Sequence, residues 1–102
     1  MPKPSLLPVD FNFLEAVPDW QLASSGQEIS REFTFKNFKS AFAFMTLSAD
    51  FAEELNHHPD WTNCWNKVGV RLSTHDLKGL TDLDITMARA MDQFARDITH
   101  QN

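Results

Sequence analysis

The alternation of apolar and polar residues along the chain predicts four short strands. The first two, at 20–22 and 29–36, flank a turn rich in serine with one glycine, so we expect a hairpin. The third strand is expected at 62–66, with a chain reversal at 66–67. The fourth, at 68–72, has the clearest pattern, because two valines and a leucine alternate with glycine and arginine. Each strand should therefore turn one face toward a core.

A helical periodicity predicts three helices between and around these strands. The first helix, at 10–16, would have Asp10 as its N-cap. The second helix, at 38–56, would be capped by Asn37. The third begins after Thr81. Asp84 then stands at the third helical position, as in a capping box.

The order of these elements defines the expected fold class. Helix, two strands, helix, two strands and helix predict an α+β fold with a four-stranded antiparallel sheet and three helices packed on one face. A chain of 102 residues forms one domain. We divide it into an extended, proline-rich arm at 1–9 and a single domain at 10–102.

The apolar surface of helix 38–56 is wider than one sheet requires. A helix packed on one sheet needs an apolar stripe of little more than 100°. This helix has two such stripes, rotated by about 120° from each other. The first stripe contains Phe38, Ala41, Phe42, Met45, Ala49 and Ala52, and the second contains Phe44, Leu47, Phe51 and Leu55. We expect the first to face the sheet and the second, through Phe44, Leu47 and Phe51, to face another copy of the protein.

Composition narrows the functional classes. The net charge of −5, without a cluster of lysine and arginine, argues against direct nucleic-acid binding. The single cysteine, Cys64, fits a reducing compartment. The start of the chain lacks the apolar core of a signal peptide, and no segment reaches the length of a membrane span. We therefore expect a cytoplasmic protein with no membrane association.

The candidate chemistry lies in three histidines at the ends of predicted elements. His57 and His58 stand at the end of the long helix, which Pro59 terminates. His75 follows the fourth strand. Imidazole exchanges protons near neutral pH, and loops at element ends are where functional residues gather. The cluster predicts a proton-transfer site.

Other interpretations of the same histidines stay open. A pair of histidines also occurs at solvated helix ends, where the helix dipole favours their charged form. Three histidines can form an open zinc site, although adjacent residues rarely aim both rings at one ion. We consider metal the minor alternative.

Several other residues have both a structural and a functional interpretation. Asp84 can cap its helix with one carboxylate oxygen and orient a histidine with the other. Glu53 lies one turn before His57 and can polarise it. Trp20, Trp61 and Trp65 are core or rim aromatics, or they stack on a flat heterocycle.

Taken together, these residues resemble the pterin-4a-carbinolamine dehydratase family. The resemblance extends from about Val17 to about Phe94. It is carried by Trp20, the run Phe33–Phe38, Glu53, His57-His58-Pro59, Trp61, the run Asn63–Val68, the run Leu72–His75, and Asp84.

The resemblance implies an activity and a site. It implies dehydration of 4a-hydroxytetrahydropterin to quinonoid dihydropterin, which recycles the cofactor of aromatic amino-acid hydroxylases. His57 and His75 are expected as the acid–base pair and His58 as a substrate-binding residue. The surrounding set is expected to be Glu53, Pro59, Trp61, Asp84 and Trp20.

The resemblance also bears on cofactors and partners. We expect no cofactor and no metal, because the pterin is the substrate. We also expect a homodimer or homotetramer formed through helix 38–56. The alternative function is a protein-binding module, since animal members of the family act as dimerisation cofactors of a homeodomain factor through the same helix.

Overall fold

The computed structural model describes residues 4–100 of the chain. Residues 1–3 of the predicted arm and 101–102 of the predicted domain lie outside the described part. The elements, in chain order, are α1 (Phe13–Ala16), β1 (Gln21–Leu22), β2 (Ile29–Thr34), α2 (Phe38–Leu55), β3 (Asp60–Cys64), β4 (Lys67–Leu72), the 3-10 helix η1 (His75–Leu77) and α3 (Asp82–His100).

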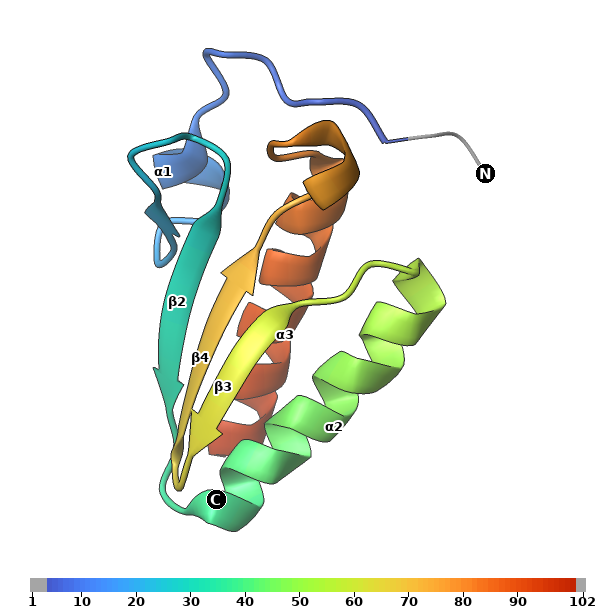
Figure 1. Cartoon of the computed structure of the whole chain (residues 1–102). Coiled ribbons are helices and arrows are strands. Elements are labelled where there is room, and N and C mark those ends of the chain that lie inside the picture. The colour runs from blue at the N-terminus through green and yellow to red at the C-terminus, as the bar shows by residue number, and fades with distance from the viewer. Residues whose placement is uncertain (1–3, 101–102) are drawn as a thin grey trace.

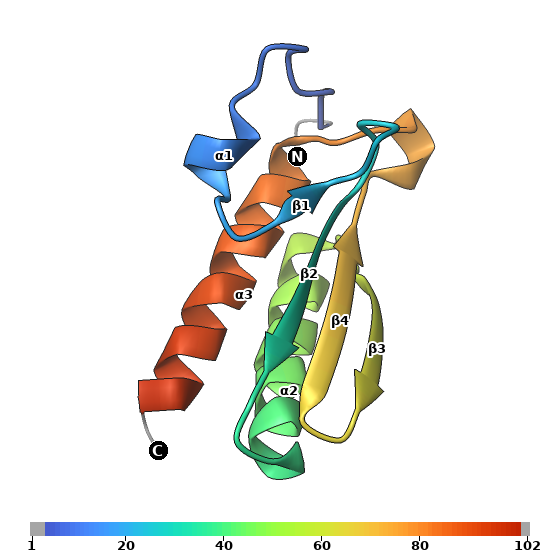
Figure 2. The ribbon, with the colours of Figure 1, turned by 90° about the vertical axis from the view of Figure 1, so that its left-hand side faces the viewer.

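The four strands form one antiparallel sheet in the order β1-β2-β4-β3. The helices α2 and α3 cover one face of it, and α1 lies beside α3 (Figures 1 and 2). The predicted α+β class and its element order are confirmed. None of the helices within residues 4–100 combines the length and the apolar character needed to cross a membrane.

The alternation in the strands decides which side chains enter the core. Ile29 and Phe33 of β2 are buried, as are Val68, Val70 and Leu72 of β4. Ser30 and Glu32 of β2, and Gly69 and Arg71 of β4, face the other side of the sheet, which neither α2 nor α3 covers (Figure 2). Arg31 is the exception, because it has the inward parity of β2 and binds Asp92 of α3. One face is therefore apolar and packed, and the other is polar and solvated, as is common in antiparallel sheets.

The third strand lies two residues earlier than the sequence predicts. It spans Asp60–Cys64, and the reversal falls at Trp65 and Asn66 instead of 66–67. Trp65 adopts a left-handed backbone with φ of 51°. The Asn63 side chain stabilises this turn by donating to the carbonyl oxygens of Trp65, at 3.1 Å, and Lys67, at 2.9 Å.

The first helix is shorter than predicted. It begins at Phe13, and Asn12 is its N-cap instead of Asp10. The Asn12 side-chain oxygen accepts a hydrogen bond of 3.1 Å from the backbone nitrogen of Glu15. Asparagine satisfies the first turn as well as aspartate does, so the sequence pattern alone does not choose between them.

The assignment of the two stripes of α2 was wrong. Phe44, expected at an interface, is 0% exposed and packs between Phe33 and Phe35, with ring centroids 4.7 and 5.1 Å away. Phe51 packs against Phe94 of α3. The helix meets the sheet and α3 together, so its buried residues come from both stripes: Phe44 from the second, and Ala41 and Ala52 from the first. Leu47, the third residue expected at an interface, is 42% exposed. The exposed part of the first stripe is the pair Phe38 and Phe42, at 48% and 54% exposure.

Among residues 4–100, one buried polar side-chain atom lacks a hydrogen-bond partner. Ser48 of α2 is fully buried, and its hydroxyl has no hydrogen-bond partner among the described residues.

We expect Ser48→Ala to raise the free energy of unfolding by about 1 to 2 kcal/mol, because it removes an unsatisfied hydroxyl and improves helix propensity. Urea denaturation would measure this. The matched control is Thr86→Ala on the exposed face of α3, which should gain only about 0.5 kcal/mol from propensity. Equal gains in both variants would contradict the explanation.

Candidate active site

The end of α2 sets the direction in which the two adjacent histidines leave the helix. Asn56 is the C-cap, with a left-handed φ of 54°, and its backbone N–H still binds the last turn. The backbone nitrogen of His57 also bonds back, to the carbonyl oxygen of Ala52 at 3.1 Å. The helix therefore closes tightly, and the two imidazoles project from the reversed chain that leads into β3.

His57 binds a carboxylate that is completely buried. Its Nε2 lies 2.6 Å from Oδ1 of Asp84, which is 0% exposed. The other oxygen, Oδ2, accepts from the backbone nitrogen of Thr81 at 2.9 Å and from Oγ1 of Thr74 at 2.8 Å. The Asp84 half of the capping box predicted for α3 is thus present, and the same carboxylate reaches a histidine.

This contact decides which nitrogen of His57 is available for chemistry. When Asp84 is ionised it can only accept hydrogen bonds, and the hydrogen then sits on Nε2. In the neutral ring, Nδ1 then keeps its lone pair and can accept a proton. Asp84 therefore orients the ring and selects its tautomer.

The helical spacing predicts that Glu53 pairs with His57, but in the structure Glu53 pairs with His58 instead. Its Oε2 lies 2.5 Å from Nε2 of His58. The i, i+4 rule holds only while the chain stays helical. Because Asn56 turns the chain into a left-handed conformation, the ring of His58 swings back toward Glu53 and the ring of His57 swings toward α3. The pair is exposed, with side-chain exposures of 56% and 77%.

His75 opens the short helix η1 directly after β4. Its Nε2 makes one long contact of 3.5 Å with the hydroxyl of Ser73, and the residue is exposed. The preceding residue, Thr74, binds Asp84. One carboxylate thus links the end of α2, which carries His57, to the loop that carries His75.

The remaining predicted site residues are divided between this region and the core. Pro59 and Trp61 continue the chain from His58 into β3 and are half-buried. Trp20 is buried, and its indole nitrogen donates to Asp92 of α3 at 2.9 Å. Arg31 shares that carboxylate at 2.5 Å. Trp20, which directly precedes β1, therefore binds a carboxylate of α3 other than the one that binds His57.

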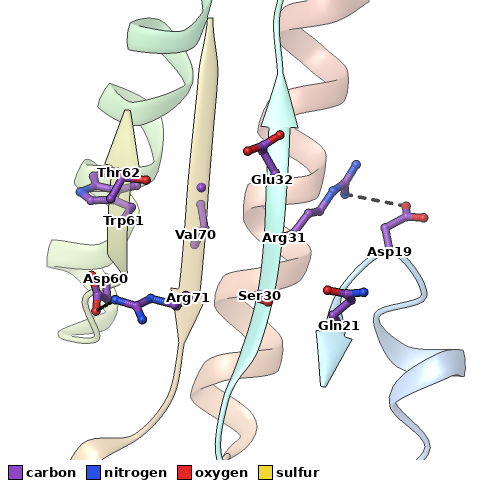
Figure 3. Close-up of a pocket in the computed structure, with 11 residues that line it drawn as sticks. Asp19, Gln21, Ser30, Arg31, Glu32, Asp60, Trp61, Thr62, Val70 and Arg71 are labelled. Atoms are coloured by element: carbon purple, nitrogen blue, oxygen red, sulfur yellow. Dashed lines mark hydrogen bonds and ion pairs between the residues drawn. The ribbon is translucent and has the colours of Figure 1, made fainter. Parts of the chain in front are cut away.

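A cavity of about 710 Å³ lies elsewhere, on the polar face of the sheet. Figure 3 shows Arg71 reaching Asp60 across neighbouring strands, and Arg31 reaching Asp19. Of the predicted site residues only Trp61 lines it. The lining comprises Asp19, Gln21, Ser30, Arg31, Glu32, Asp60, Trp61, Thr62, Gly69, Val70 and Arg71. None of the three histidines of the predicted site lines this hollow.

Within residues 4–100, no three side chains of His, Cys, Asp or Glu are grouped so that they could share an ion. The Nε2 atoms of His57 and His58 each face a separate carboxylate. The two rings are therefore directed apart, as expected for adjacent residues.

Thr74 is a site residue that our reading of the sequence missed. Thr74 follows the alternation of Val68, Val70 and Leu72 in β4, whose side chains point into the core, and it is buried as they are. A polar residue at an inward position needs a buried partner. That signal was present in the alternation and pointed to a hydrogen-bonded hydroxyl beneath His75.

Comparisons with known proteins identify the family of the chain. A family model described as pterin 4 alpha carbinolamine dehydratase matches residues 11–94. A protein of Sinorhizobium medicae (strain WSM419), named as a pterin-4-alpha-carbinolamine dehydratase, is 55% identical over 82 residues, which are 80% of this chain and 78% of that protein.

Solved structures show the same fold. A transcriptional coactivator/pterin dehydratase from Brucella melitensis has a TM-score of 0.82 and 42% identity, covering 89% of this chain and 99% of that one. A pterin dehydratase-like protein described as a RuBisCO assembly factor in the α-carboxysome has a TM-score of 0.67 and 20% identity, covering 78% of this chain and 93% of that one. The second likeness concerns the fold alone.

The fold is thus that of a small α+β dehydratase, and its class of enzyme is the hydro-lyases. The chain belongs to the pterin 4 alpha carbinolamine dehydratase family. The resemblance noted in the sequence is confirmed.

The geometry of Asp84 makes a direct prediction about the tautomer of His57. In Asp84→Asn, the single amide oxygen should keep the two donors from Thr81 and Thr74, which turns the amide NH₂ toward His57. His57 must then accept through Nε2 and carry its hydrogen on Nδ1. Nitrogen-15 NMR of the imidazoles would show this change of tautomer, with stability reduced by about 1 kcal/mol or less, because asparagine also caps helices.

The control for this variant is Asp82→Asn, which alters an exposed carboxylate in the same turn of α3. It should leave the His57 signals unchanged. Retention of the Nε2–H tautomer in Asp84→Asn would show that Asp84 does not select it.

Proposed function

We propose that the protein dehydrates 4a-hydroxytetrahydropterin (pterin-4a-carbinolamine) to quinonoid dihydropterin. The observation that carries this proposal is the contact between His57 and the buried Asp84, which leaves one ring nitrogen free for proton transfer. Membership of the dehydratase family supports the substrate class. The relatives' names support the same substrate class.

The reaction needs one proton delivered and one removed. The 4a-hydroxyl must be protonated to leave as water, and a ring nitrogen of the pterin must lose a proton. His57 and His75 would serve as the acid–base pair, because the Asp84–Thr74 link joins the two segments that hold them. General acid–base catalysis of this kind contributes typically 10²–10⁴-fold.

The remaining residues of the proposed site bind and orient the pterin. His58, held by Glu53, would contact the heterocycle, with Pro59 and Trp61 at its edge. The arrangement of Trp20 supports a structural role instead, since its indole N–H is occupied by Asp92.

The chemistry is an elimination of water and is redox-neutral. It therefore requires no electron carrier, and the two imidazoles supply both proton transfers. We propose that the protein acts without a cofactor or a metal ion. The physiological role would be recycling of the pterin cofactor of aromatic amino-acid hydroxylases, in the cytoplasm.

Substitution of the histidines tests the mechanism. We expect His57→Ala and His75→Ala each to lower kcat by about two to four orders of magnitude, since each removes a proton carrier. His58→Ala should act mainly on KM, because it is assigned to binding. Stopped-flow absorbance with synthetic carbinolamine would measure both constants.

The matched control is His100→Ala at the exposed end of α3, which should retain wild-type kinetics. Near wild-type turnover in both His57→Ala and His75→Ala would refute the proposed acid–base mechanism. Loss of activity with EDTA and its recovery with zinc would replace it with metal catalysis.

A second proposal concerns assembly, and it rests on the exposed aromatic pair of α2. Phe38 and Phe42 are about half exposed, and their ring centroids lie 5.7 Å apart. Exposed aromatic clusters on a helix mark interaction surfaces. We propose that this face of α2 packs on a second copy and forms a homodimer or homotetramer. A two-fold contact would pair the same residues from both copies.

Charged substitutions in this pair test the assembly. Phe38→Glu combined with Phe42→Lys should give a smaller species by light scattering, with an unchanged circular-dichroism spectrum, because the new i, i+4 pair supports the helix. Leu14→Glu on α1, also an exposed apolar position, is the control and should leave the mass unchanged. A wild-type protein that is monomeric at micromolar concentration would refute the proposal.

A further inference from the structure

We infer that Thr74 is a positioning residue that couples the orientations of His57 and His75. The inference rests on the proposed function, because it concerns the same two histidines. Its basis is the position of one buried hydroxyl between the carboxylate that holds His57 and the loop that carries His75.

The hydrogen bonds around Thr74 can run in only one direction. Asp84 accepts and cannot donate, so the hydrogen on Oγ1 of Thr74 must point to Oδ2 of Asp84, at 2.8 Å. Oγ1 of Thr81, 2.8 Å from Oγ1 of Thr74, must then donate to it. The oxygen of Thr81 in turn accepts from the backbone nitrogen of Leu83 at 3.2 Å. Each hydrogen-bond donor in this network of Thr74, Thr81 and Leu83 is thus assigned to one acceptor. This arrangement fixes the plane of the Asp84 carboxylate.

The backbone of Thr74 shapes the loop that begins with His75. Its N–H donates to the carbonyl oxygen of Gly79 at 2.8 Å, and its carbonyl oxygen accepts from Leu77 at 3.0 Å. Thr74 and Gly79 also form an isolated β-bridge. The loop is therefore closed at the residue whose hydroxyl binds Asp84.

A single residue thus has two tasks that meet at the site. Its backbone sets where His75 leaves the strand, and its hydroxyl restrains the carboxylate that binds His57. Loss of the hydroxyl would leave Oδ2 with one donor, from Thr81, instead of two. The carboxylate could then rotate, and the two imidazoles would lose their fixed relation.

The test compares two substitutions that differ in the hydroxyl. Thr74→Val keeps the branched shape and removes the hydroxyl, whereas Thr74→Ser keeps the hydroxyl and removes a methyl group. We expect Thr74→Val to lower kcat for synthetic carbinolamine by about 10- to 100-fold with little change in KM, as misplaced catalytic groups do. Thr74→Ser should recover most of this loss. Thr86→Val, on the exposed face of α3, controls for the substitution itself.

A readout independent of turnover is the Nε2–H proton of His57, observed by NMR. Exchange of this proton with solvent should quicken by about tenfold or more in Thr74→Val, because the acceptor is no longer fixed. It should stay at the wild-type rate in Thr74→Ser. If the wild-type protein does not dehydrate the carbinolamine, the proposed function fails, but this signal still decides whether Thr74 restrains His57.

Two results would overturn the inference. One is wild-type kcat and unchanged exchange of the His57 proton in Thr74→Val. The other is an equal loss of activity in the valine and serine variants together with an equal fall in Tm, which would assign the effect to packing of the methyl group.

Discussion

The buried carboxylate of Asp84 is the contact on which the site and this end of the fold both depend. Removal of a carboxylate from water is costly unless hydrogen bonds replace those it loses. Here the donors come from three places in the chain: His57 at the end of α2, Thr74 after β4, and the backbone of Thr81 at the start of α3. The requirement to satisfy one buried charge therefore joins three segments. It also explains why a helix cap and a histidine partner are the same residue.

The two histidine–carboxylate pairs differ in environment, and this suggests different tasks. His57 is 11% exposed at its side chain and faces a fully buried acid, so its geometry is held by packing. His58 and Glu53 lie in solvent, where ion pairs are screened and contribute little to stability. An imidazole held in one orientation suits directed proton transfer, and a solvent-exposed one is accessible to an incoming substrate. This contrast supports the roles proposed for the two rings.

The packing of α2 shows how an apolar surface divides between core and solvent. Phe44, Ser48 and Ala52 are buried because α2 meets both the sheet and α3, and small residues let these elements approach closely. The opposite flank leaves Phe38 and Phe42 in solvent. The width of the apolar arc was correctly read as an excess over what one sheet needs. The periodicity could not show which residues of the arc would stay exposed.

Local information in the sequence determined most of the elements and part of the site. Alternation located the strands to within about two residues, Pro59 marked the end of α2, and the spacing of Thr81 and Asp84 predicted the capping box. Contacts between distant residues depended on tertiary structure. The strand order, the pairing of Trp20 with Asp92 and the switch of Glu53 from one histidine to its neighbour all result from chain reversals and packing. Periodicity records only where a side chain points along its own element. The partner it meets is decided when separate elements pack together and must satisfy one another's buried polar groups.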